Sequence, residues 1–296
     1  MMVSMFGITY LQAIVLGILQ GVTELFPISS LGHSVLVPAL FGGSWHHLVT
    51  QASTGNSKTS PYLAFIVALH VATAIGLIIF YRKTWIKLIK SFFTTLSTRK
   101  IEGSDQRLIW LLLVATIPAA LAGLVFEHAF RVLFAKPEAA AIFLTINGLI
   151  LLGAEWLRRR PENALVKHHQ KLTTLPFIDA GVIGVFQTAA LLAGISRSGI
   201  TLVGGLIRGL SHEDAANFSF LMATPIILAA GLLELPELFG PAGHGIGGQV
   251  IVGALAAAVA AYLSVRFLTR YFQTRTLTPF GIYCLVFGAF CIIRFA

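Results

Sequence analysis

Long apolar runs separated by short polar connections make up most of the chain. A transmembrane helix needs about 20 mainly apolar residues to cross the hydrocarbon core of a bilayer. Runs of this length each predict a helix that spans a membrane. They lie at about residues 61–81, 108–127, 139–157, 217–235, 249–268 and 279–295.

Two further pairs of apolar runs contain members that are too short to span alone. The first pair covers residues 8–24 and 28–41, and the second begins with residues 177–193 and ends near residue 208. Irregular backbone at membrane depth is tolerated where it is buried in protein or lines a cavity. Each pair is therefore predicted to form a re-entrant helical hairpin that enters and leaves on one side.

The hairpin and the spans that follow it occur twice. A hairpin plus three spans covers about residues 8–157, and the same order returns over about 177–295. An ungapped overlay of Gly17–Ser34 on Gly184–Thr201 supports an internal repeat, although two segments rich in Gly, Ser and Ile also share residues by chance. The matches are Gly17/Gly184, Gln20/Gln187, Leu25/Leu192, Ile28/Ile195, Ser29/Ser196 and Gly32/Gly199.

Lysine and arginine gather in three connections, at 82–107, 158–171 and 270–275. The positive-inside rule places these connections in the cytoplasm and both termini outside. The two hairpins then enter from opposite sides, and their tips can meet near the midplane. We expect an all-α polytopic membrane protein, a single integral domain over residues 1–296, built from two inverted repeats.

Composition agrees with this interpretation and excludes other classes. The 296 residues are 56% hydrophobic and 11% charged, with a mean hydropathy of +0.83, which leaves too little polar surface for a water-soluble globule. The net charge of +9 lies mainly in the connections, so we expect no nucleic-acid binding. Cys284 and Cys291 share one apolar run and are interpreted as packing residues, with no metal or disulfide role.

Polar residues at the two predicted tips form a candidate site for a phosphate ester. Arg197 offers a planar, permanently charged fork that matches phosphate oxygens, and backbone N–H groups at Gly32 and Gly199 lie beside half-helix N-termini that favour anions. The candidate substrate-binding residues are Gln20, Ser29, Gly32, Ser196, Ser198, Gly199 and Thr201.

Glu24, Ser30 and His33 are the candidates for the chemistry. Glu24 suits general acid–base catalysis or a divalent cation, Mg²⁺ or Ca²⁺, that bridges phosphates. His33 is a candidate nucleophile or base, and Ser30 is the competing nucleophile. Structural roles stay open as well, because serines beside glycines often pack membrane helices, and Glu24 can pair with Arg197 for structure alone. His70 is interpreted as an interhelical hydrogen-bonding residue.

Three stretches carry a resemblance to a known family. Gln20–His33, read Gln-Gly-Val-Thr-Glu-Leu-Phe-Pro-Ile-Ser-Ser-Leu-Gly-His, closely resembles the first signature of the undecaprenyl pyrophosphate phosphatases, the bacitracin-resistance membrane phosphatases. Gly194–Thr201, read Gly-Ile-Ser-Arg-Ser-Gly-Ile-Thr, resembles the second, and Phe218–Pro225 is similar to the following helix. Gln20 departs from the family, where a first Glu is frequent, and Leu31 stands where Thr is common.

The resemblance implies hydrolysis of undecaprenyl pyrophosphate to the monophosphate lipid carrier of cell-wall synthesis, with a divalent cation. It implies that Glu24, His33 and Arg197 are the catalytic acid, histidine and phosphate-binding arginine, and that Ser30 is the second serine of the Ser-Ser pair. The expected location is the bacterial plasma membrane, with the pocket open to the periplasm or exterior. The expected partners are the polyprenyl pyrophosphate and membrane lipids; a homodimer is left open.

Two alternatives compete with this hypothesis. A prenyl-phosphate flippase or secondary transporter would use the same inverted-repeat pocket, but has less use for Glu24 and His33 beside hydroxyls. The other large class of membrane lipid phosphatases places a Lys and Arg-Pro motif ahead of its Ser-Gly-His, and no such motif precedes Ser30–His33 in this chain. The phosphatase hypothesis therefore leads.

Overall fold

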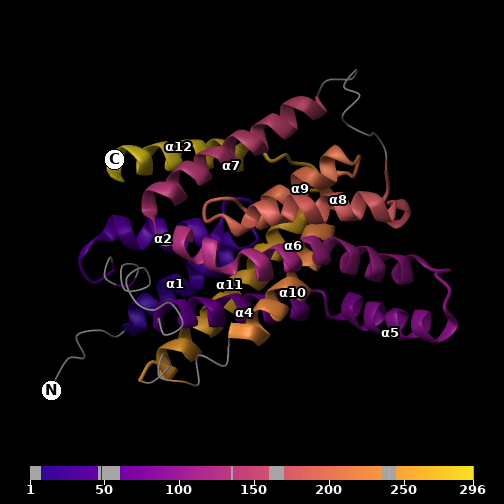
Figure 1. The fold of residues 1–296 in the computed structure, drawn as a ribbon, viewed down its shortest axis with the longest axis horizontal. Coiled ribbons are helices and arrows are strands. Elements are labelled where there is room, and N and C mark those ends of the chain that lie inside the picture. Colours follow the sequence, from indigo (N-terminus) through magenta and orange to yellow (C-terminus); the bar gives the residue numbers. More distant parts are fainter. Residues whose placement is uncertain are drawn as a thin grey trace.

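The computed structural model describes residues 8–45, 48, 61–134, 136–159, 170–234, 240 and 245–295. These residues form helices and connections, with no strand among them, and Figure 1 shows the helices gathered into one bundle. The helices are α1 (Tyr10–Thr23), α2 (Ser30–Phe41), α4 (Pro61–Phe80), α5 (Arg82–Thr98), α6 (Ser104–Phe134), α7 (Pro137–Arg158), α8 (Phe177–Thr188), α9 (Arg197–Ile207), α10 (His212–Glu234), α11 (Gly247–Tyr271) and α12 (Thr278–Phe295), with short 3₁₀ turns at Leu172–Thr174 and Ala189–Leu191.

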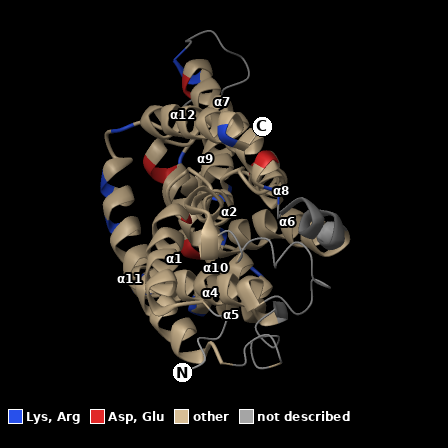
Figure 2. Cartoon of the chain, turned by 90° about the vertical axis from the view of Figure 1, so that its left-hand side faces the viewer, with Lys and Arg blue, Asp and Glu red and all other residues tan. Residues whose placement is uncertain are grey.

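Six helices in the described part of the chain are long and apolar enough to cross a membrane. They are α4, α6, α7, α10, α11 and α12, and they match the six predicted spans to within a few residues. Figure 2 shows how sparse charged positions are along the helices. The all-α membrane fold predicted from hydropathy is confirmed.

Exposed apolar side chains on α11 show how the bundle meets lipid. They recur every four residues, which places them on one helix face, and each is more than half exposed. In water such a face would be costly, whereas hydrocarbon solvates it. The residues are Ile251, Leu255, Val259, Leu263 and Phe267.

The two predicted hairpins are present as pairs of short helices. α1 begins at a capping box, in which Thr9 accepts from the Gln12 backbone and the Gln12 side chain accepts from the Thr9 backbone. It ends at Glu24, and α2 restarts at Ser30 after an irregular tip. In the second hairpin, α8 and α9 flank a tip that turns through Gly194 at φ 111°, a left-handed conformation that favours glycine.

The second helix of each hairpin begins in the same way. Ser29 caps α2 by accepting from the Gly32 N–H, and Ser196 caps α9 by accepting from the Gly199 N–H. These serines are paired in the sequence overlay, so the local structure agrees with an internal repeat. The inverted relation of the two halves, and their orientation in the membrane, stay predictions.

One connection differs from the sequence expectation. Residues 82–107 were predicted to be a basic loop, but Arg82–Thr98 form the helix α5. Its lysines and its apolar residues recur at the spacing of a helix and so lie on different faces. An average hydropathy over the whole stretch does not show this pattern. Leu88 is buried, while Ile86 and Phe93 are exposed. The helix ends at Arg99, whose φ of 55° is left-handed.

Glycines let the helices approach at backbone distance. A Cβ added to Gly17 of α1 would lie 2.3 Å from the Gly253 carbonyl oxygen of α11, and one added to Gly76 of α4 would lie 2.6 Å from the Ala258 carbonyl oxygen. Small residues at such contacts are the usual means of packing helices in membranes. α11 therefore fixes both α1 and α4, which position the site described next.

Candidate active site

Glu24 lies at the C-terminal end of α1 and is almost fully buried, with 6% of its surface exposed. Three side chains approach its Oε2 atom. Ser30 Oγ donates to it at 2.5 Å, Gln20 Nε2 donates at 3.1 Å, and His70 Nε2 lies 3.4 Å away. A buried carboxylate needs such partners to stay charged, so the first hairpin and α4 together form a charged centre.

Arg197 completes this centre from the second hairpin. It is the first residue of α9, and its side chain is 12% exposed. Nε and Nη2 donate to Glu24 Oε1 at 3.3 and 3.1 Å, and Nη1 donates to the Ser219 carbonyl oxygen at 3.3 Å. The two predicted tips therefore meet, and they meet through the residues expected to carry the chemistry.

Asn147 of α7 forms hydrogen bonds with both hairpin tips. Its Nδ2 donates to the Pro27 carbonyl at 3.1 Å, and its Oδ1 accepts from the Ser196 N–H at 3.0 Å. The sequence interpretation did not select this residue. A polar amide inside a predicted span was the available signal, because such groups in membranes usually bind a partner.

Several predicted substrate-binding groups hold the tips in this structure. Ser29 Oγ accepts from the N–H groups of Gly32 and Gly194, both at 3.2 Å, so it ties one tip to the other. Ser29 has a φ of 73°, which is strained for a residue other than glycine. The Gly32 N–H is thus occupied by its cap, and its contact with substrate remains a prediction.

The second tip shows the same pattern. Ser196 caps the Gly199 N–H at 3.1 Å, and Ser198 Oγ donates to the Phe26 carbonyl at 3.1 Å. Thr201 Oγ1 donates to the Arg197 carbonyl at 2.7 Å and lies 2.6 Å from Ser219 Oγ. These groups position Arg197, and their direct binding of substrate also remains a prediction.

His33 bonds to groups other than Glu24. Its Nδ1 donates to the Ser29 carbonyl at 2.7 Å, and its Nε2 shares a 2.7 Å hydrogen bond with the Tyr283 hydroxyl of α12. The ring stacks against Tyr283 and Phe287. Within the described residues, no hydrogen bond or ion pair joins His33 to Glu24. Its catalytic role therefore remains a prediction.

His70 is the histidine that reaches the carboxylate. It lies in the middle of α4, and it is the sole ionisable His, Asp, Glu, Lys or Arg of Pro61–Phe80. The sequence interpretation assigned it an interhelical hydrogen bond. In the structure, its Nδ1 bonds to the Ile66 carbonyl within α4, and its Nε2 lies at ion-pair distance from the candidate catalytic carboxylate. An ionisable side chain inside a span marks functional chemistry by default, and that signal was present in the sequence.

The residues around Glu24 do not fit a metal ion held by the protein alone. Among the described residues, no group of three His, Cys, Asp or Glu side chains is close enough to bind one. Glu24 Oε1 faces Arg197, and Oε2 faces Ser30, Gln20 and His70. Gln20 Oε1 is buried without a described hydrogen-bond partner. One carboxylate and one amide oxygen are too few for a resident site.

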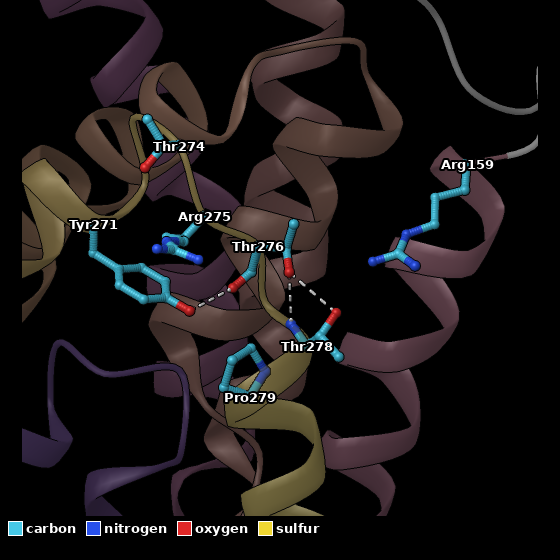
Figure 3. A pocket seen from close by; sticks show the side chains of 7 residues that line it. All are labelled: Arg159, Tyr271, Thr274, Arg275, Thr276, Thr278 and Pro279. Atoms are coloured by element: carbon cyan, nitrogen blue, oxygen red, sulfur yellow. Dashed lines mark hydrogen bonds between the residues drawn. The ribbon is translucent and has the colours of Figure 1, made fainter.

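A separate hollow of about 680 Å³ lies at the end of α7 and the turn between α11 and α12 (Figure 3). The Tyr271 hydroxyl donates to the Thr276 carbonyl at its wall. The hollow shares no lining residue with the Glu24 centre and contains no lining carboxylate, so it lacks the groups for the expected reaction. Its lining residues are Arg159, Tyr271, Thr274, Arg275, Thr276, Thr278 and Pro279.

Comparisons with known proteins identify the family of the chain. The family model described as "Bacitracin resistance protein BacA" matches residues 13–290. The chain is 57% identical to "Undecaprenyl-diphosphatase 2" of Frankia alni over 99% of both chains, and 54% identical to "Undecaprenyl-diphosphatase" of Mycolicibacterium paratuberculosis over 98% of both. It is 45% identical to "Undecaprenyl-diphosphatase 2" of Burkholderia thailandensis over 94% of both. The chain therefore belongs to the bacitracin resistance protein BacA family.

Proposed function

We propose that this protein is an integral membrane undecaprenyl-diphosphatase that hydrolyses undecaprenyl pyrophosphate to undecaprenyl phosphate and inorganic phosphate. The names of its relatives support the substrate. The observation that carries the proposal is the contact of Ser30 and Arg197 with the Glu24 carboxylate, because it joins a nucleophile, a base and a phosphate-binding group at the meeting of two hairpins.

Ser30 is the nucleophile in this proposal, and Glu24 is its base. The 2.5 Å hydrogen bond from Ser30 Oγ to Glu24 Oε2 places the carboxylate where it can take the hydroxyl proton. Ser30 Oγ then forms a bond to the distal phosphorus, and the bond from that phosphorus to the bridging oxygen breaks. Undecaprenyl phosphate leaves, and water hydrolyses the phosphoserine to restore Ser30 and release phosphate. The role of His33 remains a separate prediction.

Arg197 supplies charge stabilisation to the transferring group. A guanidinium has five N–H donors, and three of them bond to Glu24 and Ser219 in this structure. The other two remain for phosphate oxygens. Phosphoryl transfer depends mainly on positioning and electrostatic stabilisation, so a bidentate, permanently charged group beside the nucleophile suits the reaction.

Membrane location and the cation complete the proposal. The protein is a multi-pass membrane protein. We assign it to the bacterial plasma membrane with the site open to the exterior, as the resemblance to the bacitracin-resistance membrane phosphatases implies, and with the basic connections in the cytoplasm. A divalent cation enters with the pyrophosphate, since the surrounding side chains do not hold one alone. A homodimer stays a prediction.

Phosphate release from undecaprenyl pyrophosphate by the purified, detergent-solubilised protein tests the proposal. We expect activity in the wild type and a loss of at least about a hundredfold in Arg197→Ala, because transition-state charge loses its partner. Arg294→Ala is the matched control, since Arg294 is exposed at the end of α12. Detergent removes the second compartment, so a transporter or flippase without hydrolysis releases no phosphate. Absence of release by the wild type would contradict the proposal.

A further inference from the structure

His70 stands in the middle of α4, a helix that contributes no other group to the Glu24 centre among the described contacts. Its Nε2 atom is 3.4 Å from Glu24 Oε2, and 19% of its side chain is exposed. Glu24 therefore lies between an arginine and a histidine from different helices. Arg197 faces Oε1 from α9, and His70 faces Oε2 from α4.

The other ring nitrogen of His70 bonds within its own helix. Nδ1 lies 2.8 Å from the Ile66 carbonyl oxygen, which can only accept, so Nδ1 is a donor. Nε2 then faces an oxygen that already accepts from Ser30 and Gln20. A bare Nε2 lone pair would repel this oxygen, whereas an Nε2–H attracts it. Because Nδ1 already carries a proton, an Nε2–H makes the ring an imidazolium, and in that form the contact with Glu24 is an ion pair.

Contacts on both sides of His70 hold α4 in place. The Tyr62 hydroxyl, two turns before His70, donates to the Ser34 carbonyl of α2 at 2.6 Å. Gly76, on the other side of His70, packs at backbone distance against α11. These contacts fix the height of His70 beside the tip, so its approach to Glu24 follows from packing on both sides.

We propose that His70 is a positioning residue that holds the Glu24 carboxylate on the Ser30 hydroxyl. This inference rests on the proposed function, in which Glu24 takes the Ser30 proton. Arg197 holds Oε1 of Glu24, while two of its other donors remain for phosphate. His70 lies against Oε2, the same oxygen that accepts from Ser30. Nucleophile, base and a third group that orients the base form the arrangement known from other activated nucleophiles.

Two substitutions test separately the hydrogen-bond donor of His70 and the volume of its side chain. His70→Leu keeps an apolar side chain of moderate size and removes the donor, while His70→Gln keeps an amide N–H₂ that can reach the carboxylate. We expect kcat to fall about 10- to 100-fold in His70→Leu, with KM changed about twofold or less, because a charge-assisted contact to the base is lost. His70→Gln should recover most of kcat.

Thr73→Val is the matched control on the same helix. Thr73 is also buried in α4, and its hydroxyl donates to the Leu69 carbonyl without touching Glu24. The control should keep the wild-type kcat. Melting temperature and monodispersity in detergent, measured for every variant, show whether each one is folded.

The outcomes separate this inference from the function on which it rests. A wild type without phosphate release contradicts the proposed function. An active wild type with an equally active His70→Leu overturns the positioning role alone. Equal losses in folded His70→Leu and His70→Gln overturn it too, because a requirement for imidazole volume or shape, and not for a donor, would then explain the loss.

Discussion

Ser29 and Ser30 are neighbours in the sequence, but their hydroxyls belong to different networks. Ser29 Oγ accepts two backbone N–H groups and joins the tips of both hairpins. Ser30 Oγ donates to Glu24, the candidate base. A motif containing both serines does not reveal this division, because it depends on which way each residue faces at the start of α2.

Substitution of each serine by alanine should distinguish the structural role of Ser29 from the catalytic role proposed for Ser30. Ser30→Ala removes the nucleophile, so phosphate release should fall by at least about a thousandfold while the melting temperature stays near that of the wild type. Ser29→Ala removes a helix cap and the link to Gly194, so we expect a free energy of unfolding lower by about 1–2 kcal/mol. Activity assays and thermal unfolding in detergent measure the two effects. A fully active Ser30→Ala would exclude the Ser30 mechanism.

The residue scale also shows what sequence motifs select and what they miss. Glu24, Ser30 and Arg197 were selected as candidates, and the structure brings them together across more than 160 residues of chain. His70 was given only a structural role and Asn147 was not selected. Each lies in the apolar middle of a spanning helix, and its partner is determined only when the helices pack.

At the scale of elements, helix boundaries were predicted well wherever hydropathy changes sharply. The six spans and both broken pairs follow from run length and from the polar tips. α5 was missed because its basic residues lower the average hydropathy of the stretch while its periodicity remains helical. Average hydropathy therefore identifies apolar spanning helices better than amphipathic helices such as α5.

Close packing of α1 on α11 predicts a position that cannot accept a side chain. Gly17→Ala places a Cβ 2.3 Å from the Gly253 carbonyl oxygen, so the helices must separate, and we expect a destabilisation of about 1–3 kcal/mol. The matched control is Gly153→Ala in α7, where a Cβ meets nothing within 4 Å. Thermal unfolding in detergent compares the two. Equal melting temperatures would contradict the close contact.

At the scale of the whole molecule, α4, α7 and the two hairpins converge on one charged centre. The centre contains a carboxylate, an arginine and one histidine, His70, but no cluster of three metal ligands among the described residues. The predicted divalent cation is therefore expected to belong to the substrate complex.

Chelation should consequently affect activity and stability differently. We expect EDTA to abolish phosphate release, and excess Mg²⁺ or Ca²⁺ to restore it, because the pyrophosphate loses the cation that offsets its charge. The melting temperature of the substrate-free protein should not change. A lower melting temperature after chelation would indicate a resident cation, and undiminished release in EDTA would contradict the cation requirement.

The sequence alone determined the membrane class, the six spans, the two interrupted pairs and the candidate residues for phosphate chemistry, because run length and isolated polar groups are local properties of the chain. Only the tertiary structure decided which of those groups touch. It turned His33 toward Tyr283 and brought His70 to Glu24. The physical reason is that such contacts depend on the rotation and height of each helix, which backbone-distance packing at small residues sets.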